Sequence, residues 1–358
     1  MSAYTPDLVL AHLARGLVEL EQMTDAPRPG GLPYPESLHI GWNRLGRLML
    51  RRGLPIPPSL PALLDLCEQP LPWPGLDLPD GAWLTGDRLL HDREVTDACI
   101  EIAAQAGDLE YDEQLMVEVL EYCRDQGKHL QPTYECFRTF LTEKLLLLNA
   151  ELLNATQEPP LNPLSDYLKR SYEPVPASCL HDGQVYTCKH CGWTVTWRGD
   201  RPRCLWRECP GNGDPDSVEP IAHPRQQLLR LRPGLYRYVA VPGQAEQNFF
   251  RQVRRYGIKI DLYPDFDRWD CRLHLGDGET WAVDVKDWGR PYWLARELKE
   301  KRRDPVDSRA IVVIPDRRVE EYPGYLNALN NCVDPQNGLE FRSASQLLQE
   351  VEQRMGGD

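Results

Sequence analysis

The chain has 358 residues, of which 41% are hydrophobic, and a formal net charge of −13 at pH 7. This length and apolar content suffice for two or three domains, each with its own core, and they exclude a disordered or fibrous protein. No apolar run approaches the length of a membrane span, and the N-terminus lacks both the basic start and the small-residue cleavage site of a signal peptide. We therefore expect a cytoplasmic protein with no membrane partner.

The negative charge is concentrated in the first part of the chain. Residues 1–160 contain 12 Lys and Arg against 25 Asp and Glu. The other 198 residues contain 29 Lys and Arg and 29 Asp and Glu. The first part is therefore poorly suited to lie along a phosphate backbone. The neutral remainder can still gather its basic residues on one face.

Residues 1–160 predict an acidic α-helical domain with proline-rich connections. The first helix should begin near Thr5 as N-cap and Pro6 as first helical residue. Its apolar stripe consists of Leu8, Val9, Leu13 and Leu17. Further helices are predicted over 37–53, 112–129 and 133–153. This part contains neither a glycine-rich phosphate loop nor a cluster of catalytic side chains, so we expect it to dock a partner or to brace its neighbour.

Residues 161–224 contain a cysteine pattern that is typical of metal binding. Five of the chain's 11 cysteines lie between 179 and 209, which favours a metal site in a reducing compartment over disulfides. The ligand set that we predict is Cys188, Cys191, Cys204 and Cys209. Two knuckles separated by a short β-like segment can close a tetrahedral shell of four thiolates around Zn²⁺, so this segment predicts a zinc ribbon.

A closed shell of four cysteines leaves no open position for water, so we assign the zinc a structural role. Cys179, His181 and His190 are spare donors, for which we favour an ordinary structural role. The aromatic and basic residues around the ribbon are open to two interpretations, because they can stack on and pair with nucleic acid or simply pack a small core.

Residues 225–358 predict an α/β domain in which the two kinds of element are interleaved. A helix over 242–257 is followed by a hairpin, whose strands 268–275 and 280–288 are joined by the turn "GDGE". Then come a helix over 291–303, a buried strand over 308–315 and a closing helix over 343–355.

The hairpin places charged residues where apolar ones are expected. Because side chains alternate along a strand, Asp284 and Lys286 point to one face and the neighbouring valines enter the core. Asp270 leads into the partner strand. Two carboxylates brought this close resist joint ionisation unless a cation neutralises them, and Mg²⁺ suits oxygen ligands. This arrangement is typical of a metal-dependent phosphodiesterase, in which the lysine holds or activates water.

The stretch "PDFDRWDCRLHL…WAVDVKDW" resembles the PD-(D/E)xK motif of the restriction-endonuclease-like superfamily over residues 235–355. Asp284 and Lys286 match the (D/E)xK element, and Glu246 matches a glutamate that the family often places on the preceding helix. The upstream acidic residue remains open: Asp270 fits best, then Asp267, then Asp265. The resemblance implies a site in which Asp270, Asp284 and the Val285 carbonyl bind Mg²⁺ or Mn²⁺, Lys286 positions water and Glu246 assists.

The whole arrangement also resembles the restriction-type nuclease found beside prokaryotic PIWI-like proteins in bacterial defence islands. That resemblance implies a DNA endonuclease of antiviral defence, directed to its target by a protein partner from the same operon. Cutting both strands generally needs two active sites, so a homodimer is implied only for that reaction. One alternative is a catalytically silent nuclease fold that binds nucleic acid or scaffolds a complex. Another is a transcription-related ribbon protein, which leaves the acidic strands unexplained.

Overall fold

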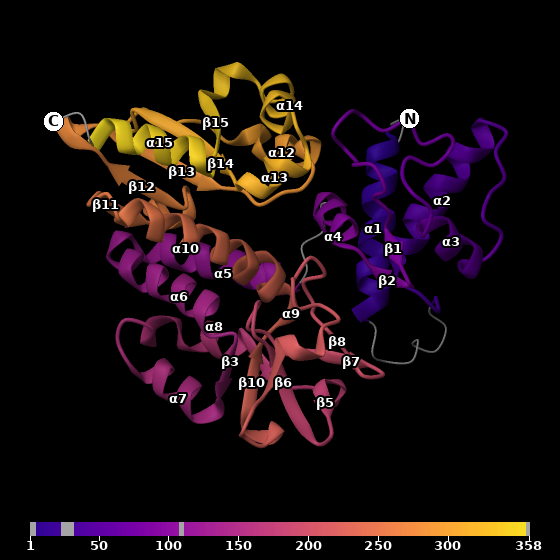
Figure 1. The fold of residues 1–358 in the computed structure, drawn as a ribbon, viewed down its shortest axis with the longest axis horizontal. Coiled ribbons are helices and arrows are strands. Elements are labelled where there is room, and N and C mark those ends of the chain that lie inside the picture. The colour runs from indigo at the N-terminus through magenta and orange to yellow at the C-terminus, as the bar shows by residue number, and fades with distance from the viewer. Residues whose placement is uncertain (1–4, 23–31, 107–110, 356–358) are drawn as a thin grey trace. The chain divides into compact units, whose positions relative to one another are not determined.

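The protein is described by a computed structural model that covers residues 5–22, 32–106 and 111–355 (Figure 1). The chain passes back and forth between two units. Unit 1 consists of Met1–Asp108, Trp288–Arg302 and Asp316–Asn337, and unit 2 of Leu109–Asp287, Arg303–Pro315 and Gly338–Asp358. No helix within the described ranges combines the length and apolar character needed to cross a membrane.

Unit 1 is built mainly of helices, as the sequence predicts for the N-terminal part. Its elements are α1 (Pro6–Gln22), α2 (Glu36–Arg51), α3 (Leu60–Cys67), β1 (Leu90–His91), β2 (Glu94–Val95), α4 (Asp97–Ala103), α12 (Pro291–Glu297), α13 (Asp316–Glu321) and α14 (Tyr325–Cys332). Helices α1 and α2 pack closely at two glycines. A Cβ on Gly16 would lie 2.2 Å from the Leu38 nitrogen, and one on Gly41 would lie 2.7 Å from the Leu13 nitrogen. The backbones approach so closely that only glycine fits.

The segment that contains α12 is part of the unit 1 core. Trp293 is fully buried among the apolar residues of the N-terminal helices, and its indole N–H donates to the Ala82 carbonyl at 2.8 Å. The buried Arg290 guanidinium pairs with Asp87 at 2.7 Å and with Glu101 at 2.6 Å. Residues 288–302 therefore complete a core whose other members come mainly from the N-terminal part of the chain.

Unit 2 contains a five-stranded mixed sheet in the order β11-β12-β13-β14-β15. Its strands are β11 (Lys259–Leu262), β12 (Cys271–His274), β13 (Thr280–Val285), β14 (Arg309–Ile314) and β15 (Leu339–Ser343). The predicted hairpin is β12 with β13, which pair antiparallel, and the predicted buried strand is β14, which runs parallel to β13. The mixed α/β character of this region is confirmed, but the sequence did not reveal the edge strands β11 and β15.

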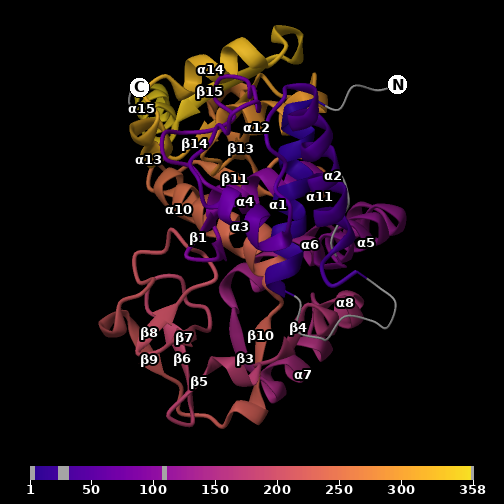
Figure 2. The ribbon, with the colours of Figure 1, turned by 90° about the vertical axis from the view of Figure 1, so that its right-hand side faces the viewer.

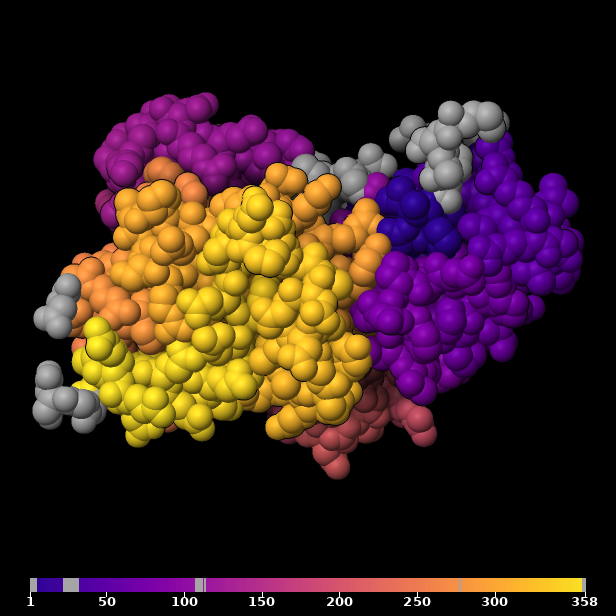
Figure 3. Space-filling model, turned by 90° about the horizontal axis from the view of Figure 1, so that it is seen from above, coloured from indigo at the N-terminus to yellow at the C-terminus, as the bar shows by residue number. Residues whose placement is uncertain are grey.

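Two helices cover one face of this sheet. α10 (Val241–Arg254) contributes Phe249, Phe250 and Val253, and α15 (Ala344–Met355) contributes Leu347 and Val351. They share an apolar cluster with alternate residues of the strands: Cys271, Leu273, Val283, Val285, Ile311 and Val313. The other side of α15, yellow in Figure 3, lies at the surface, where Glu352 and Arg354 are exposed.

α5 (Tyr111–Gln126) and α6 (Gln131–Glu143) also belong to unit 2, and in Figure 1 α10 lies between them and the sheet. The prediction of one helix over 133–153 is wrong. α6 ends at Glu143, and the leucine run forms β3 (Leu146–Leu148) before α7 (Asn149–Gln157) begins. β3 pairs with β10 (Leu228–Leu231), which pairs on its other side with β4 (Tyr172–Pro174) (Figure 2). A pairing partner about eighty residues away overrides the helical preference of leucine.

The cysteine-rich segment is made of short strands. They are β5 (Leu180–His181), β6 (Gln184–Cys188), β7 (Thr196–Arg198), β8 (Arg201–Arg203) and β9 (Val218–Pro220). The β-like segment predicted between the two cysteine pairs leads into β7, which pairs antiparallel with β8. Short helices α8 (Ser165–Arg170), α9 (Pro233–Leu235) and α11 (Pro264–Asp267) complete unit 2. The three-domain division at residues 160 and 224 stays a prediction.

Candidate functional site

Two buried aspartates meet on adjacent strands of the sheet. Cys271 pairs with Val283, and continuing this register places Asp270 across from Asp284 on the same face. Both residues are almost fully buried, with 4% of Asp270 and 1% of Asp284 exposed. The Val285 backbone N–H donates to Asp270 Oδ2 at 2.6 Å, which fixes the Asp270 carboxylate against β13.

Lys286 follows directly after β13 and lies beside Asp284. Its Nζ is 3.0 Å from Asp284 Oδ1, and its side chain is 25% exposed where that of Asp284 is 2% exposed. The Val285 side chain between them points the other way, into the apolar cluster under α10 and α15. The alternation predicted for this strand therefore places an ammonium group beside a buried carboxylate at the end of the strand.

Glu246 reaches the same region from α10 and is also buried. Its Oε2 accepts a hydrogen bond of 3.0 Å from the Tyr263 hydroxyl, and its Oε1 accepts one of 3.5 Å from Arg138 Nη2 on α6. Arg138 and the two tyrosines of this network, Tyr134 and Tyr263, were not identified from the sequence. A lone arginine on an amphipathic helix carries no signal of its own.

The other two candidate aspartates lie on a left-handed turn that leads to Asp270. Tyr263, Asp265, Phe266 and Asp267 have φ between 44° and 64°, a region that non-glycine residues rarely adopt. Asp267 Oδ2 accepts from the Tyr134 hydroxyl at 2.7 Å and lies 3.4 Å from Arg138 Nε. Asp265 is more exposed and pairs with Arg272 at 3.4 Å. Of the three aspartates, Asp270 is the one that bonds to the strand of Asp284.

The buried carboxylates perturb one another. Burial, and then the negative charge of Glu246, raises the pKa of Asp270 well above its ordinary value. Burial also raises the pKa of Glu246, although Arg138 opposes the shift. Burial alone would lower the pKa of Lys286, but Asp284 and Asp270 outweigh it and raise that pKa. Asp270 and Glu246 therefore each resist ionisation while their acidic neighbours are charged.

The charges of this cluster suit a divalent cation. The four carboxylates of Glu246, Asp267, Asp270 and Asp284 face two cationic side chains, Arg138 and Lys286. When all four carboxylates are ionised, two negative charges are left over, the charge that one Mg²⁺ ion would neutralise, and carboxylate oxygens are the donors that Mg²⁺ prefers. The residues present therefore fit this ion.

The spacing favours two protein carboxylates on such an ion rather than three. Among the described residues, the one group of three or more potential ligands whose donor atoms all lie within 4.8 Å of one another is formed by cysteines. Glu246, Asp270 and Asp284 do not form such a group. Mg²⁺ commonly keeps several waters and takes only one or two carboxylates, so Asp270 and Asp284 alone would be a sufficient set.

Asp270→Asn is expected to stabilise the metal-free protein at neutral pH. The raised pKa of Asp270 means that the folded state holds this proton more tightly than the unfolded state, so its contribution to stability is lost as pH rises above about 4. Asparagine can still accept from the Val285 N–H but carries no charge. We expect Tm in EDTA to rise by about 2 °C or more at pH 8, with a smaller gain at pH 5. Calorimetry at both pH values checks this, and a variant that is less stable than wild type at pH 8 would contradict it.

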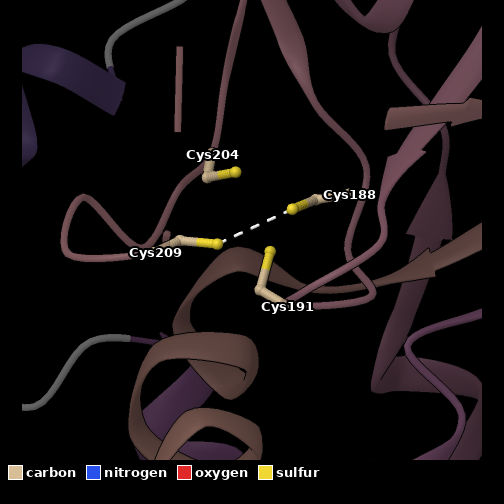
Figure 4. Close-up of side chains that lie close together, drawn as sticks. All are labelled: Cys188, Cys191, Cys204 and Cys209. Atoms are coloured by element: carbon tan, nitrogen blue, oxygen red, sulfur yellow. Dashed lines mark hydrogen bonds between the residues drawn. The ribbon is translucent and has the colours of Figure 1, made fainter. Parts of the chain in front are cut away.

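The four predicted zinc ligands converge in a separate, buried cluster. The sulfur atoms of Cys188, Cys191, Cys204 and Cys209 all lie within 4.8 Å of one another, and in Figure 4 they point toward a common centre. The Cys188 and Cys209 sulfurs are 3.6 Å apart. A tetrahedral zinc ion with Zn–S bonds of about 2.3 Å holds its sulfurs about 3.8 Å apart. The cluster therefore fits a structural zinc ion.

Local backbone features shape the two knuckles. Gly192, at φ 71°, closes the first one, where its N–H donates to the Cys188 carbonyl at 2.8 Å. In the second knuckle, four residues separate Cys204 from Cys209, against two in the first. The Asn212 side chain accepts from the Cys204 N–H at 3.0 Å and holds this longer turn. Gly211 is required because a Cβ there would lie 2.7 Å from the Cys188 sulfur.

The spare donors have other partners. Cys179 lies 3.4 Å from Arg230 Nη1, and His190 Nε2 lies 3.3 Å from the Ser217 hydroxyl. His181 stacks on Trp197 with ring centroids 3.9 Å apart. Trp193 is buried and stacks on Tyr236 at 4.6 Å, which makes it a packing residue.

Two family models match separate parts of the chain. Residues 243–358 match the family described as "REase associating with pPIWI_RE", and residues 9–147 match "pPIWI_RE three-gene island domain Y". Neither the curated proteins nor the solved structures compared with the chain gave a match. The chain thus combines an N-terminal domain Y of the pPIWI_RE three-gene island with a C-terminal REase domain of the family that associates with pPIWI_RE.

Proposed function

We propose that the protein is a Mg²⁺-dependent endonuclease that hydrolyses DNA phosphodiester bonds in defence against foreign DNA. The observation that carries the proposal is the buried Asp270–Asp284 pair with Lys286 at its edge, in a segment that matches an REase family. Several carboxylates buried close together destabilise the folded protein unless they bind a ligand. A divalent ion that in turn contacts a phosphate would be such a ligand.

In this proposal Asp270, Asp284 and the Val285 carbonyl hold Mg²⁺ or Mn²⁺. When bound, the ion polarises the phosphate and neutralises charge on it. Lys286, whose Nζ lies 3.0 Å from Asp284 Oδ1, orients the attacking water and stabilises the negative charge that grows on the phosphate. Glu246 assists from α10, where Tyr263 and Arg138 hold its carboxylate.

The rest of the chain has supporting roles in this proposal. A zinc ion bound by Cys188, Cys191, Cys204 and Cys209 keeps the short strands of the ribbon folded, and the ribbon guides the substrate. The acidic helical part docks a protein partner. Because both matched families are named for pPIWI_RE, we propose a pPIWI_RE protein as the partner that selects the target.

The test is a cleavage assay on supercoiled plasmid, linear duplex and single-stranded DNA, with Mg²⁺, Mn²⁺ or EDTA. We expect cutting that needs the metal and that disappears in Asp284→Asn. Asp265→Asn is the matched control, because its more exposed carboxylate pairs with Arg272 and should be dispensable. Asp270→Asn, tested beside Asp265→Asn, shows which of these two aspartates is the first ligand: we expect cutting to disappear in Asp270→Asn and to remain in Asp265→Asn.

If the isolated chain does not cut DNA, the assay is repeated with the pPIWI_RE protein added. If DNA still remains intact, the endonuclease proposal fails. The chain is then better described as a silent nuclease fold that binds nucleic acid or scaffolds a complex. Linearisation of plasmid without a nicked intermediate would indicate two sites acting together, as in a homodimer.

A further inference from the structure

Arg138 is a buried arginine next to the candidate active site, but it does not come from the REase domain. It lies on α6, within residues 9–147 that match domain Y, whereas the REase match begins at residue 243. Its side chain is 7% exposed. A buried guanidinium is costly to desolvate, so its partners should explain why it is there.

The partners of Arg138 are two acids of the site. Its Nη2 lies 3.5 Å from Glu246 Oε1, and its Nε lies 3.4 Å from Asp267 Oδ2. Its guanidinium also lies over the ring of Tyr263, with Cζ 4.9 Å from the centroid. The planar fork of arginine can hold two acids in fixed directions, which an ammonium group cannot do. Arg138 therefore connects α10, the left-handed turn and α6 at one point.

Residues that precede Arg138 in the sequence hold the same turn by hydrogen bonds to the backbone of the turn. The Gln131 side chain donates to the Tyr263 carbonyl at 2.8 Å and accepts from the Phe266 N–H at 3.0 Å. Arg124 on α5 donates to the Phe266 carbonyl at 3.1 Å. A turn with four non-glycine residues at positive φ needs such external support to persist. The turn leads directly into Asp270, so its position sets that of the carboxylate.

We propose that Arg138 is a positioning residue for the cleavage reaction and that α6 is part of the nuclease core. By holding Glu246 and Asp267, Arg138 keeps these two acids from turning toward the metal, so that Asp270 and Asp284 bind it in one geometry. This inference rests on the proposed endonuclease function. It assigns a part of domain Y to the active site of the REase domain.

The proposal separates metal binding from catalysis. Arg138→Met removes one positive charge and leaves Glu246 held by Tyr263 alone, so the site becomes more negative but less ordered. We expect Mn²⁺ affinity, measured by titration calorimetry, to be unchanged or higher, while kcat for DNA cleavage falls about 10- to 100-fold. Simple loss of the folded site would weaken both quantities together.

Two further variants make the test independent of overall stability. Arg138→Lys keeps the charge but not the fork, so we expect wild-type Mn²⁺ affinity with a kcat between those of wild type and Arg138→Met. In Arg138→Met combined with Glu246→Gln, we expect kcat to be no lower than in Glu246→Gln alone, because the neutral amide needs no cationic partner and the Tyr134 hydroxyl still holds Asp267. Arg170→Met on α8, which removes an arginine that is 38% exposed, is the matched control and should not change kcat.

The outcomes separate this inference from the function on which it rests. If wild-type protein does not cleave DNA with any metal or with the partner, the endonuclease proposal fails. If wild-type protein cleaves and Arg138→Met cleaves within about twofold of it, the positioning role is overturned. The role is equally overturned if Arg138→Met loses Mn²⁺ binding and Arg138→Lys fully restores kcat, because the charge alone would then be sufficient.

Discussion

Lys286→Met is expected to slow Mg²⁺-dependent DNA cleavage by about 10²- to 10³-fold while leaving divalent-metal binding intact. The ammonium lies 3.0 Å from Asp284 Oδ1, and the Lys286 side chain is 25% exposed where that of Asp284 is 2% exposed. It is the cation that would stabilise charge on the phosphate. Its removal takes nothing from the carboxylates that would hold the metal, so Mn²⁺ should bind at least as tightly.

Single-turnover cleavage rates and Mn²⁺ titration measure the two sides of this expectation. Lys286→Arg keeps the charge and should retain more activity than Lys286→Met, although its planar head does not reproduce the position of the ammonium. Lys259→Met on β11 is the matched control in the same sheet, because Lys259 is 72% exposed and pairs with Asp261. Cleavage by Lys286→Met within tenfold of wild type would contradict the assigned role.

Cys191→Ser is expected to cause the largest loss of stability of any single change discussed, more than about 4 kcal/mol for the ribbon segment. The strands β7, β8 and β9 have three residues each, too short to hold the segment by backbone pairing alone. The four thiols lie in the same apolar cluster as Trp193 and Tyr236. Loss of one ligand should therefore release zinc and disrupt packing around the site.

Metal analysis and thermal unfolding followed by near-UV circular dichroism check this result. We expect about one zinc per chain in wild type and close to none in Cys191→Ser. Cys179→Ser is the matched control, since Cys179 is also buried nearby but lies outside the group of four. A Cys191→Ser protein that keeps its zinc and its Tm would show that the cluster does not hold the ion.

The parts of the fold that depend on near neighbours in sequence were predictable. The β12–β13 hairpin follows from two β-like runs on either side of a glycine turn, and α10 ends shortly before Gly257, which has φ 73°. The cysteine group follows from spacing, since each pair lies on a tight turn. In each case the residues that fix the structure lie within about twenty positions of one another.

Contacts between distant parts of the sequence were not predictable. The leucines of β3 follow the helical pattern of α6, and only pairing with β10 turns them into a strand. The motif alone left three aspartates open, and their different surroundings appear only once the turn is seen against Arg138, Tyr134 and Arg272. Arg138 could not be found at all, because its partner Glu246 lies more than a hundred residues later.

The six alternating segments of the two units mean that the chain passes between them five times. Modules joined by a single linker can be exchanged between genes by one recombination event. Here such an event at either of the first two crossings would separate Trp293 from the N-terminal helices that enclose it, and one between the two matched regions would separate Arg138 from Glu246. We therefore expect domain Y and the REase domain of this protein to be inherited as a pair, with substitutions in one compensated in the other.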